Sequence, residues 1–236
     1  MAIEHRTCVV TGATDGIGRA VALALAGAGA RLAVCARTAD RVYQLVRELD
    51  RDGTVVGAPC DVSDEGAVQT FATFARDRLG PVDVLVNNAG LARFGSAWEL
   101  PVEAFDETLA VNVRGTYLMT RAFLPDMLAR GDGHIINIAS LAGRNPVPGA
   151  AAYAAAKHAV LGFSKSLFGE VRQHGVRVTA LCPGSVVTPF FEKSGGSLDR
   201  PERKLQPEDI ADTVLAVLRL PPRALISELD IRPANP

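Results

Sequence analysis

Several features are scarce in this chain of 236 residues, and each scarcity narrows the possible functions. No stretch is long and apolar enough to span a bilayer, because the longest uncharged runs, 20–30 and 178–191, are too short or too rich in glycine and proline. The formal net charge is only -1, so bulk electrostatics draw the chain to neither nucleic acid nor an anionic membrane. We therefore expect a soluble protein with neither of these partners.

Cysteine is also scarce. The four cysteines, Cys8, Cys35, Cys60 and Cys182, are far apart, fall in or beside apolar runs and form no Cys-x-x-Cys pair, which favours buried reduced thiols. The first residues, Met-Ala-Ile-Glu-His-Arg, lead into an apolar run without the core of a signal peptide. We expect a cytoplasmic protein.

Histidine is rare as well, with four residues in the chain. The positions of His134, His158 and His174 show no spacing typical of metal ligands, so the sequence predicts no metal site.

What the chain does contain is an alternation of short apolar runs with amphipathic ones. The apolar runs predict strands over 7–10, 31–36, 54–58, 82–86, 135–138, 176–181 and 224–231. The amphipathic runs between them predict six helices. Three have both bounds, namely 16–28, Pro101 to about Leu128, and 151–174. The other three have only a predicted start, two of them following the capping residues Thr38 and Ser63 and the last beginning at Pro207.

This alternation predicts the fold class. Strands that are apolar throughout and separated by helices are typical of a parallel sheet covered on both faces. We expect an α/β protein with a Rossmann-like, doubly wound sheet of about seven parallel strands and helices on both faces. The absence of a linker or repeat predicts a single domain over 1–236.

Residues 188–206 break the alternation. They contain two adjacent glycines followed by the charged run 199–204, a composition that fits a disordered linker. The stretch also follows the carboxyl end of the sixth strand, which is the ligand edge of such a sheet. We interpret 188–206 as a substrate-binding lid, with the linker as the alternative.

A glycine-rich turn joins the first predicted strand to the first helix, Thr11-Gly12-Ala13-Thr14-Asp15-Gly16-Ile17-Gly18. Glycines in this place permit a tight turn and let the backbone approach a pyrophosphate at the positive end of the helix. No Gly-Lys-Ser/Thr follows, which disfavours a phosphate-loop nucleotidase.

A second candidate site lies between Ser140 and Lys157. Tyr153 and Lys157 are four residues apart in an alanine-rich run, so a helix would place both on one face. An ammonium near a phenol favours the phenolate and is expected to lower the tyrosine pKa below its ordinary value of about 10. For these two residues alone, a surface pair that shares a helix face is the simpler interpretation.

The motifs taken together resemble one family. Thr11-Gly12-x-x-x-Gly16-x-Gly18, Asn87-Asn88-Ala89-Gly90, Asn112, Ser140, Tyr153-x-x-x-Lys157 and Pro183-Gly184 occur in the order and at the spacing of the short-chain dehydrogenase/reductase family. The resemblance covers nearly the whole chain.

The resemblance implies four catalytic residues. Tyr153 would exchange a proton with the substrate oxygen, and Ser140 would hydrogen-bond that oxygen. Lys157 would lower the pKa of Tyr153 and hold the hydroxyls of the nicotinamide ribose. Asn112 would hold a water that links Lys157 to solvent, its alternative role being a polar contact between helices.

The resemblance also implies a set of cofactor-binding residues. Besides Tyr153 and Lys157 it comprises Gly12, Thr14, Asp15, Gly16, Ile17, Gly18, Arg37, Thr38, Asp61, Val62, Asn88, Ala89, Gly90, Pro183, Gly184, Val186 and Thr188. Asp61 has a structural alternative, because it precedes a capped helix and can brace that turn.

The residues after the second strand favour NADP(H) over NAD(H). An acidic residue there would accept from the ribose 2'-hydroxyl, whereas Arg37-Thr38 offers a guanidinium that can grip a 2'-phosphate. Asp15 departs from this pattern, because many NADP-preferring members have a basic residue there. We expect NADP(H) to be preferred and NAD(H) to be possible.

Four aromatic residues are candidates for the substrate pocket. Phe94 and Trp98 either line it or anchor their loop, and Phe190 and Phe191 in the lid stretch are better placed to exclude water. The resemblance further implies that the long alanine-rich helices pack into a homodimer or homotetramer.

The function implied is hydride transfer between NADP(H) and a small carbonyl or secondary alcohol. A 3-oxoacyl-[acyl-carrier-protein] reductase is the alternative among enzymes. An NADP-sensing regulatory protein is the alternative of another class, although such members usually lose the tyrosine or the lysine.

Overall fold

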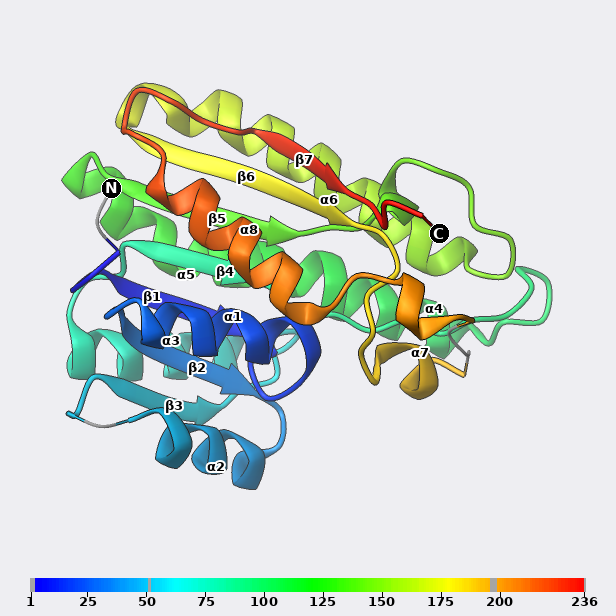
Figure 1. Ribbon diagram of the computed structural model, residues 1–236, viewed down its shortest axis with the longest axis horizontal. Helices are drawn as coiled ribbons and strands as arrows, with labels where there is room; N and C mark the ends of the chain where they lie inside the picture. Colours follow the sequence, from blue (N-terminus) through cyan, green and yellow to red (C-terminus); the bar gives the residue numbers. More distant parts are fainter. Residues whose placement is uncertain (1–2, 51, 196–198, 236) are drawn as a thin grey trace.

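Seven parallel strands form the centre of the molecule (Figure 1). The computed structural model describes residues 3–50, 52–195 and 199–235. The strands are β1 Thr7–Thr11, β2 Arg31–Ala36, β3 Val55–Pro59, β4 Val84–Asn87, β5 Gly133–Ile138, β6 Val176–Pro183 and β7 Glu228–Ile231. Their order in the sheet is β3-β2-β1-β4-β5-β6-β7, which confirms the predicted α/β doubly wound sheet.

Helices cover both faces of this sheet. The longer helices are α1 Gly16–Gly27, α2 Ala39–Leu49, α3 Glu65–Leu79, α4 Val102–Leu109, α5 Gly115–Arg130, α6 Ala151–Val171 and α8 Pro207–Arg219. Helices α1, α2 and α8 share one apolar core with the sheet, whereas α3, α5 and the end of α6 share another on the opposite face. Because both faces are packed, β1, β4, β5 and β6 are buried along their whole length.

The strand order reverses beside β1. From β1 the chain moves outward to β2 and β3, and then returns to place β4 on the other side of β1. Loops on the two sides of this reversal diverge at the carboxyl ends of the strands and leave a crevice there.

The predicted helix from Pro101 to about Leu128 is confirmed as a continuous helical stretch, but it is not α-helical throughout. Pro101 precedes the first residue of α4, and a π-helical turn, η1 Ala110–Arg114, separates α4 from α5. Such a turn holds one residue more than a regular turn and is frequent at functional sites. Asn112 lies in it.

Two predicted boundaries are wrong in detail. Asp64, not Ser63, caps α3 by accepting from the Ala67 amide. Thr38 is the N-cap residue of α2 as predicted, although its side chain makes no capping bond. The seventh strand begins at Glu228 rather than at 224, and before it the carbonyl oxygens of Ser227 and Ile226 accept from the Ala180 amide and the Thr179 hydroxyl of β6.

Candidate active site

A cavity of about 620 Å³ lies at the carboxyl ends of the strands, where the order reverses. Its walls come from the turn after β1, the loops after β4, β5 and β6, the first turns of α6, and the short helix α7 Phe190–Lys193. A volume of this size is typical of pockets for cofactors and small ligands.

The glycine turn after β1 forms one end of the cavity. Gly12 and Gly16 have φ of +62° and +48°, a backbone conformation that favours glycine. A Cβ on Gly18 would lie 2.3 Å from the Gly12 carbonyl oxygen, so only glycine lets α1 start this close to the turn. Asn88 holds the turn by donating from Nδ2 to the carbonyl oxygens of Thr11 and Gly12.

Asp15 lies at the start of α1, within this turn. Its carboxylate accepts from the Gly16 amide and forms ion pairs with Lys193 of α7 and, at 3.6 Å, with Arg41 of α2. Burial opposes its ionisation, but the Lys193 contact, the Gly16 amide and Arg41 together lower the pKa of Asp15. Lys193 and Arg41 therefore balance the negative charge of Asp15, the residue at which the sequence departs from the NADP-preferring pattern.

Arg37 and Thr38 lie between β2 and α2, near the same end of the cavity but outside its lining. The Arg37 side chain is 62% exposed and approaches Glu107 of α4 at 3.9 Å. At this distance and exposure the ion pair is weak, so the guanidinium is available to another anion.

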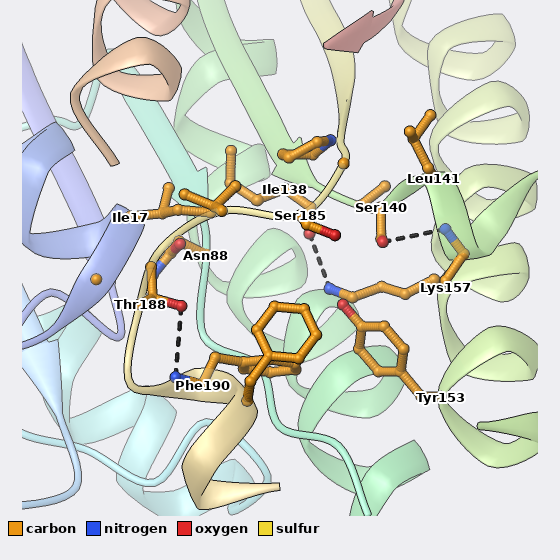
Figure 2. A pocket seen from close by; sticks show the side chains of 18 of the residues that line it. Ile17, Asn88, Ile138, Ser140, Leu141, Tyr153, Lys157, Ser185, Thr188 and Phe190 are labelled. Carbon is orange, nitrogen blue, oxygen red and sulfur yellow. Dashed lines mark hydrogen bonds between the residues drawn. The ribbon is translucent and has the colours of Figure 1, made fainter. Parts of the chain in front are cut away.

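Ser140, Tyr153 and Lys157 point into the middle of the cavity (Figure 2). Ser140 follows β5 and interacts with the Tyr153 hydroxyl, while Tyr153 and Lys157 share one face of α6. The Lys157 Nζ lies 5.6 Å from the centre of the Tyr153 ring and donates to the Ile138 carbonyl oxygen at 2.9 Å.

The expected acidification of Tyr153 is wrong for this structure. Burial raises the pKa of Tyr153 to about 12, and the Ser140 hydroxyl offsets only part of this effect. Burial likewise lowers the pKa of Lys157 to about 8. Removal of both groups from water thus outweighs the attraction between ammonium and phenolate that the sequence suggested.

Asn112 lies behind the cavity lining. Its Nδ2 donates to the carbonyl oxygens of Leu91 and Thr108, which fixes the amide orientation. Its Oδ1 is buried without a hydrogen-bond partner among the described residues. A Cβ on Gly90 would lie 2.8 Å from this oxygen and 3.6 Å from the Lys157 Nζ, so both atoms border one small space.

The comparisons with known proteins agree on the family. The short chain dehydrogenase family model matches residues 6–197. The chain belongs to the short-chain dehydrogenase/reductase family. It is 43% identical over 188 residues to the putative ketoacyl reductase 1 of the granaticin polyketide synthase from Streptomyces violaceoruber, which covers 78% of this chain and 69% of that protein.

Two solved structures show how closely this short-chain dehydrogenase follows the family fold. The alcohol dehydrogenase of Thermococcus sibiricus, complexed with 5-hydroxy-NADP, superposes with a TM-score of 0.88 at 33% identity, covering 98% of this chain and 97% of that one. A variant of actinorhodin polyketide ketoreductase, complexed with NADPH, superposes with a TM-score of 0.90 at 34% identity. The match covers 99% of this chain and 98% of that one.

Most of the cofactor-binding residues predicted for this short-chain dehydrogenase line the cavity. They are Gly12, Asp15, Gly16, Ile17, Asn88, Ala89, Gly90, Tyr153, Lys157, Pro183, Gly184, Val186 and Thr188.

Other predicted residues lie outside the lining, namely Thr14, Gly18, Arg37, Thr38, Asp61 and Val62. Asp61 accepts from the Ser63 amide and hydroxyl, so it braces the turn before α3 as its structural alternative required. Val62 packs against Gly115 of α5. Their cofactor roles stay predictions.

The lid residues are only partly covered by the structure, because 196–198 lie outside the described residues. Phe190 and Phe191 form α7 with Lys193 and line the cavity. Phe94 lines it too, whereas Trp98 is 86% exposed and does not.

Sequence reasoning missed several lining residues of the short-chain dehydrogenase, among them Leu141, Val147, Lys204 and Arg232. The first two follow β5, and Arg232 follows β7, so the shared carboxyl edge was the available signal. Lys204 was predicted only as part of the lid 188–206, and it reaches the cavity next to Leu205, which pairs with Ser185 and Val187.

Proposed function

We propose that this protein is an NADP(H)-dependent oxidoreductase that interconverts a ketone or aldehyde with its alcohol, using Tyr153 as general acid and base. The observation that carries the proposal is the convergence of Ser140, Tyr153 and Lys157 in one cavity with the glycine turn of α1 at its end. The same cavity thus contains side chains that can transfer a proton to a substrate and a helix N-terminus that can bind the cofactor pyrophosphate.

The residues present fit a nicotinamide dinucleotide. The left-handed glycines of the turn leave a backbone cradle at the N-terminus of α1, which suits a pyrophosphate. Arg37 and Thr38 would hold a 2'-phosphate, since neither side chain has a strong partner. The structural relatives complexed with NADPH and 5-hydroxy-NADP favour the same choice, with NAD(H) as a possible substitute.

The bound cofactor supplies or accepts the hydride. In reduction, Tyr153 donates its phenolic proton to the substrate oxygen, and its pKa of about 12 keeps that proton in place at neutral pH. Ser140 hydrogen-bonds the same oxygen as negative charge develops on it. Lys157 contributes positive charge beside Tyr153, and the unpaired Asn112 Oδ1 can hold a water that supplies Lys157 with protons.

The test is reduction of ketones and aldehydes with NADPH, followed by the loss of its absorbance. We expect Tyr153→Phe to lower kcat/KM by about 100-fold or more, the usual range for loss of a general acid. Tyr43→Phe, which alters an exposed tyrosine on α2, serves as the matched control and should retain activity. A Tyr153→Phe protein with near-normal turnover would overturn the assignment.

A 3-oxoacyl thioester is the second candidate substrate. The 43% identity to a protein named as a putative ketoacyl reductase, and the fold match to a polyketide ketoreductase, favour it. An acetoacetyl thioester reduced with a much higher kcat/KM than any simple ketone would support this alternative. A purely NADP-sensing role is disfavoured, because Ser140, Tyr153 and Lys157 are all present.

A further inference from the structure

The part of the cavity beside Tyr153 is walled by aromatic rings that contact one another in a closed circuit. The Tyr153 ring lies 6.4 Å from Phe94 at an interplanar angle of 88°, and 5.5 Å from Phe190. Phe191 completes the circuit at 6.3 Å from Phe94 and 5.9 Å from Phe190. Figure 2 shows Phe190 beside Tyr153 at the cavity wall. We call this group of four rings the aromatic chamber.

Three elements far apart in the sequence build the aromatic chamber. Phe94 comes from the loop after β4, Tyr153 from α6, and Phe190 and Phe191 from α7. The loop contacts the end of α7, because the Phe94 amide donates to the Ser194 carbonyl oxygen at 3.4 Å and the Arg93 Nη1 donates to the Lys193 carbonyl oxygen at 3.4 Å. The chamber walls are thus held in place by backbone contacts as well as by ring packing.

Apolar surface in the chamber stays open to the cavity. Phe94, Phe190 and Phe191 are only partly buried, and Val147, which also lines the cavity, is 40% exposed. Apolar side chains that converge on a cavity without filling it are typical of a ligand site with an apolar ligand.

Most charges in the lining already have partners. Asp15, the only carboxylate among the described lining residues, pairs with Lys193 and Arg41 at the glycine turn. Arg232 pairs with Asp230 at 3.1 Å. No described carboxylate of the lining is therefore free to receive a cationic substrate.

Lys204 is the exception. Apart from Lys157, the cavity lining contains three cations among the described residues. Lys193 and Arg232 form ion pairs, and Lys204 forms none within that part of the chain. A substrate that carries a carboxylate would have to pair with Lys204. The test below therefore compares an aryl ketone with a ketone that carries a carboxylate.

We propose that the substrate is a hydrophobic ketone whose side chain ends in an aryl group, seated in the aromatic chamber. This inference rests on the proposed function. The carbonyl carbon receives a hydride from the reduced cofactor, which is oxidised, and the carbonyl oxygen receives the proton of Tyr153, giving a secondary alcohol. The side chain of the ketone packs against Phe94, Phe190 and Phe191, where edge-to-face contacts favour a flat ring.

The first test compares benzylacetone with levulinate, two methyl ketones whose two-carbon side chain ends in a phenyl ring or in a carboxylate. With NADPH we expect kcat/KM for benzylacetone to exceed that for levulinate by about tenfold or more, as burial of a phenyl ring implies. A preference for levulinate would overturn this inference while leaving the proposed function intact. Failure to reduce any ketone with NADPH or NADH would overturn both.

The second test asks whether the chamber causes the preference. Phe191→Ala removes a ring that contacts Phe94 and Phe190, and we expect the ratio of kcat/KM for benzylacetone over butanone to fall by about fivefold or more. Tyr43→Ala removes an exposed ring outside the cavity and should leave the ratio unchanged. An unchanged ratio in Phe191→Ala would contradict the assignment of the chamber.

Discussion

At the scale of single residues, the two central ionisable groups are both held in their neutral forms more strongly than in water. Burial raises the pKa of the Tyr153 phenol and lowers that of the Lys157 ammonium, so neither charged form is favoured by the protein alone. A tyrosine that keeps its proton suits the role of acid, whereas a lysine with a pKa of about 8 can lose its charge within the working range of pH.

The titration of Lys157 gives a first prediction. Its cation is present below about pH 8 and is lost as the pH rises through that value, so kcat/KM for NADPH should fall above pH 8 by up to about tenfold per pH unit. Lys157→Arg, which stays charged, should be slower but lack this fall. A wild-type profile that is flat to pH 10 would contradict the role of Lys157.

A second prediction concerns Arg37 and the choice of cofactor. Arg37→Ala should lower kcat/KM for NADPH by about 10- to 100-fold and leave that for NADH within about twofold, because only NADPH carries the 2'-phosphate. Steady-state kinetics with both cofactors measures this. Equal losses for NADPH and NADH would indicate that Arg37 acts elsewhere.

The sequence predicted which catalytic side chains come together, because a motif defines them. It did not predict their pKa values or their long-range contacts, because these depend on tertiary packing. Ser140, Tyr153 and Lys157 meet in the cavity as their spacing and order suggested. The direction of the Tyr153 pKa shift was wrong, because it depends on how much water the surrounding fold removes. The contact of Lys193 with Asp15 joins residues 178 positions apart, and no local pattern encodes such a pair.

At the scale of elements, α1 starts within contact distance of the strand that precedes it. Gly18 sits where a Cβ would meet the Gly12 carbonyl oxygen and the Asn88 Nδ2, both at 2.3 Å. Gly27, at the other end of the same helix, has no atom within 4 Å of such a Cβ. Substitution of Gly18 therefore tests how closely α1 packs against the turn, and substitution of Gly27 in the same helix is the control.

This contrast yields a third prediction. Gly18→Ala should lower the free energy of unfolding by about 1–3 kcal/mol through overpacking and should weaken NADPH binding. Gly27→Ala should leave binding intact and stabilise the protein by up to about 1 kcal/mol, the helix preference for alanine. Urea denaturation and a fluorescence titration with NADPH would measure both. A Gly18→Ala protein that binds NADPH normally would show that the turn can adapt.

Elements were predictable where burial decided them. The central strands β1, β4, β5 and β6 are buried on both faces, and the sequence locates six of the seven strands within one or two residues. The π-helical turn between α4 and α5 was not predicted, because residues 110–114 contain no glycine or proline. Within that turn Asn112 is buried and donates to the Leu91 and Thr108 carbonyl oxygens, contacts that only the folded chain shows.

At the scale of the whole molecule, one buried histidine links stability to pH. The His134 Nε2 contacts the Thr179 hydroxyl, which itself donates to the Ile226 carbonyl oxygen, so Nε2 carries the proton and Nδ1 is left as a buried acceptor. Burial, with the nearby Arg177 and Arg6, lowers the pKa of His134 to about 3.

The sign of this effect gives a fourth prediction. Between about pH 6.5 and pH 3 the unfolded chain binds a proton at His134 that the folded chain does not, so stability is lost as the pH falls through this window. The slope should be about 1.4 kcal/mol per pH unit. His134→Gln should lack this contribution, and denaturant curves from pH 7 to pH 4.5 would compare the two proteins. Identical slopes would show that His134 is protonated in the fold.

Assembly gives a fifth prediction. Val102, Phe105 and Tyr117 on α4 and α5 are large hydrophobic side chains that are 69%, 39% and 48% exposed, which favours the homodimer or homotetramer that the family resemblance implies. Light scattering should therefore give a mass above that of one chain, and Tyr117→Glu should lower it. A monomeric wild-type protein would contradict this proposal.

The wide separation in sequence of the residues that share the cavity has a consequence for synthesis on the ribosome. Gly16 lies near the start of the chain, but Thr188, which packs against it, is made only after about four-fifths of the 236 residues. The first three strands, β1, β2 and β3, emerge early and lie next to one another in the sheet, yet the cavity is incomplete until β6 and the loop after it emerge. We therefore expect the cofactor to stabilise the chain only late in its synthesis, once the loop after β6 has emerged.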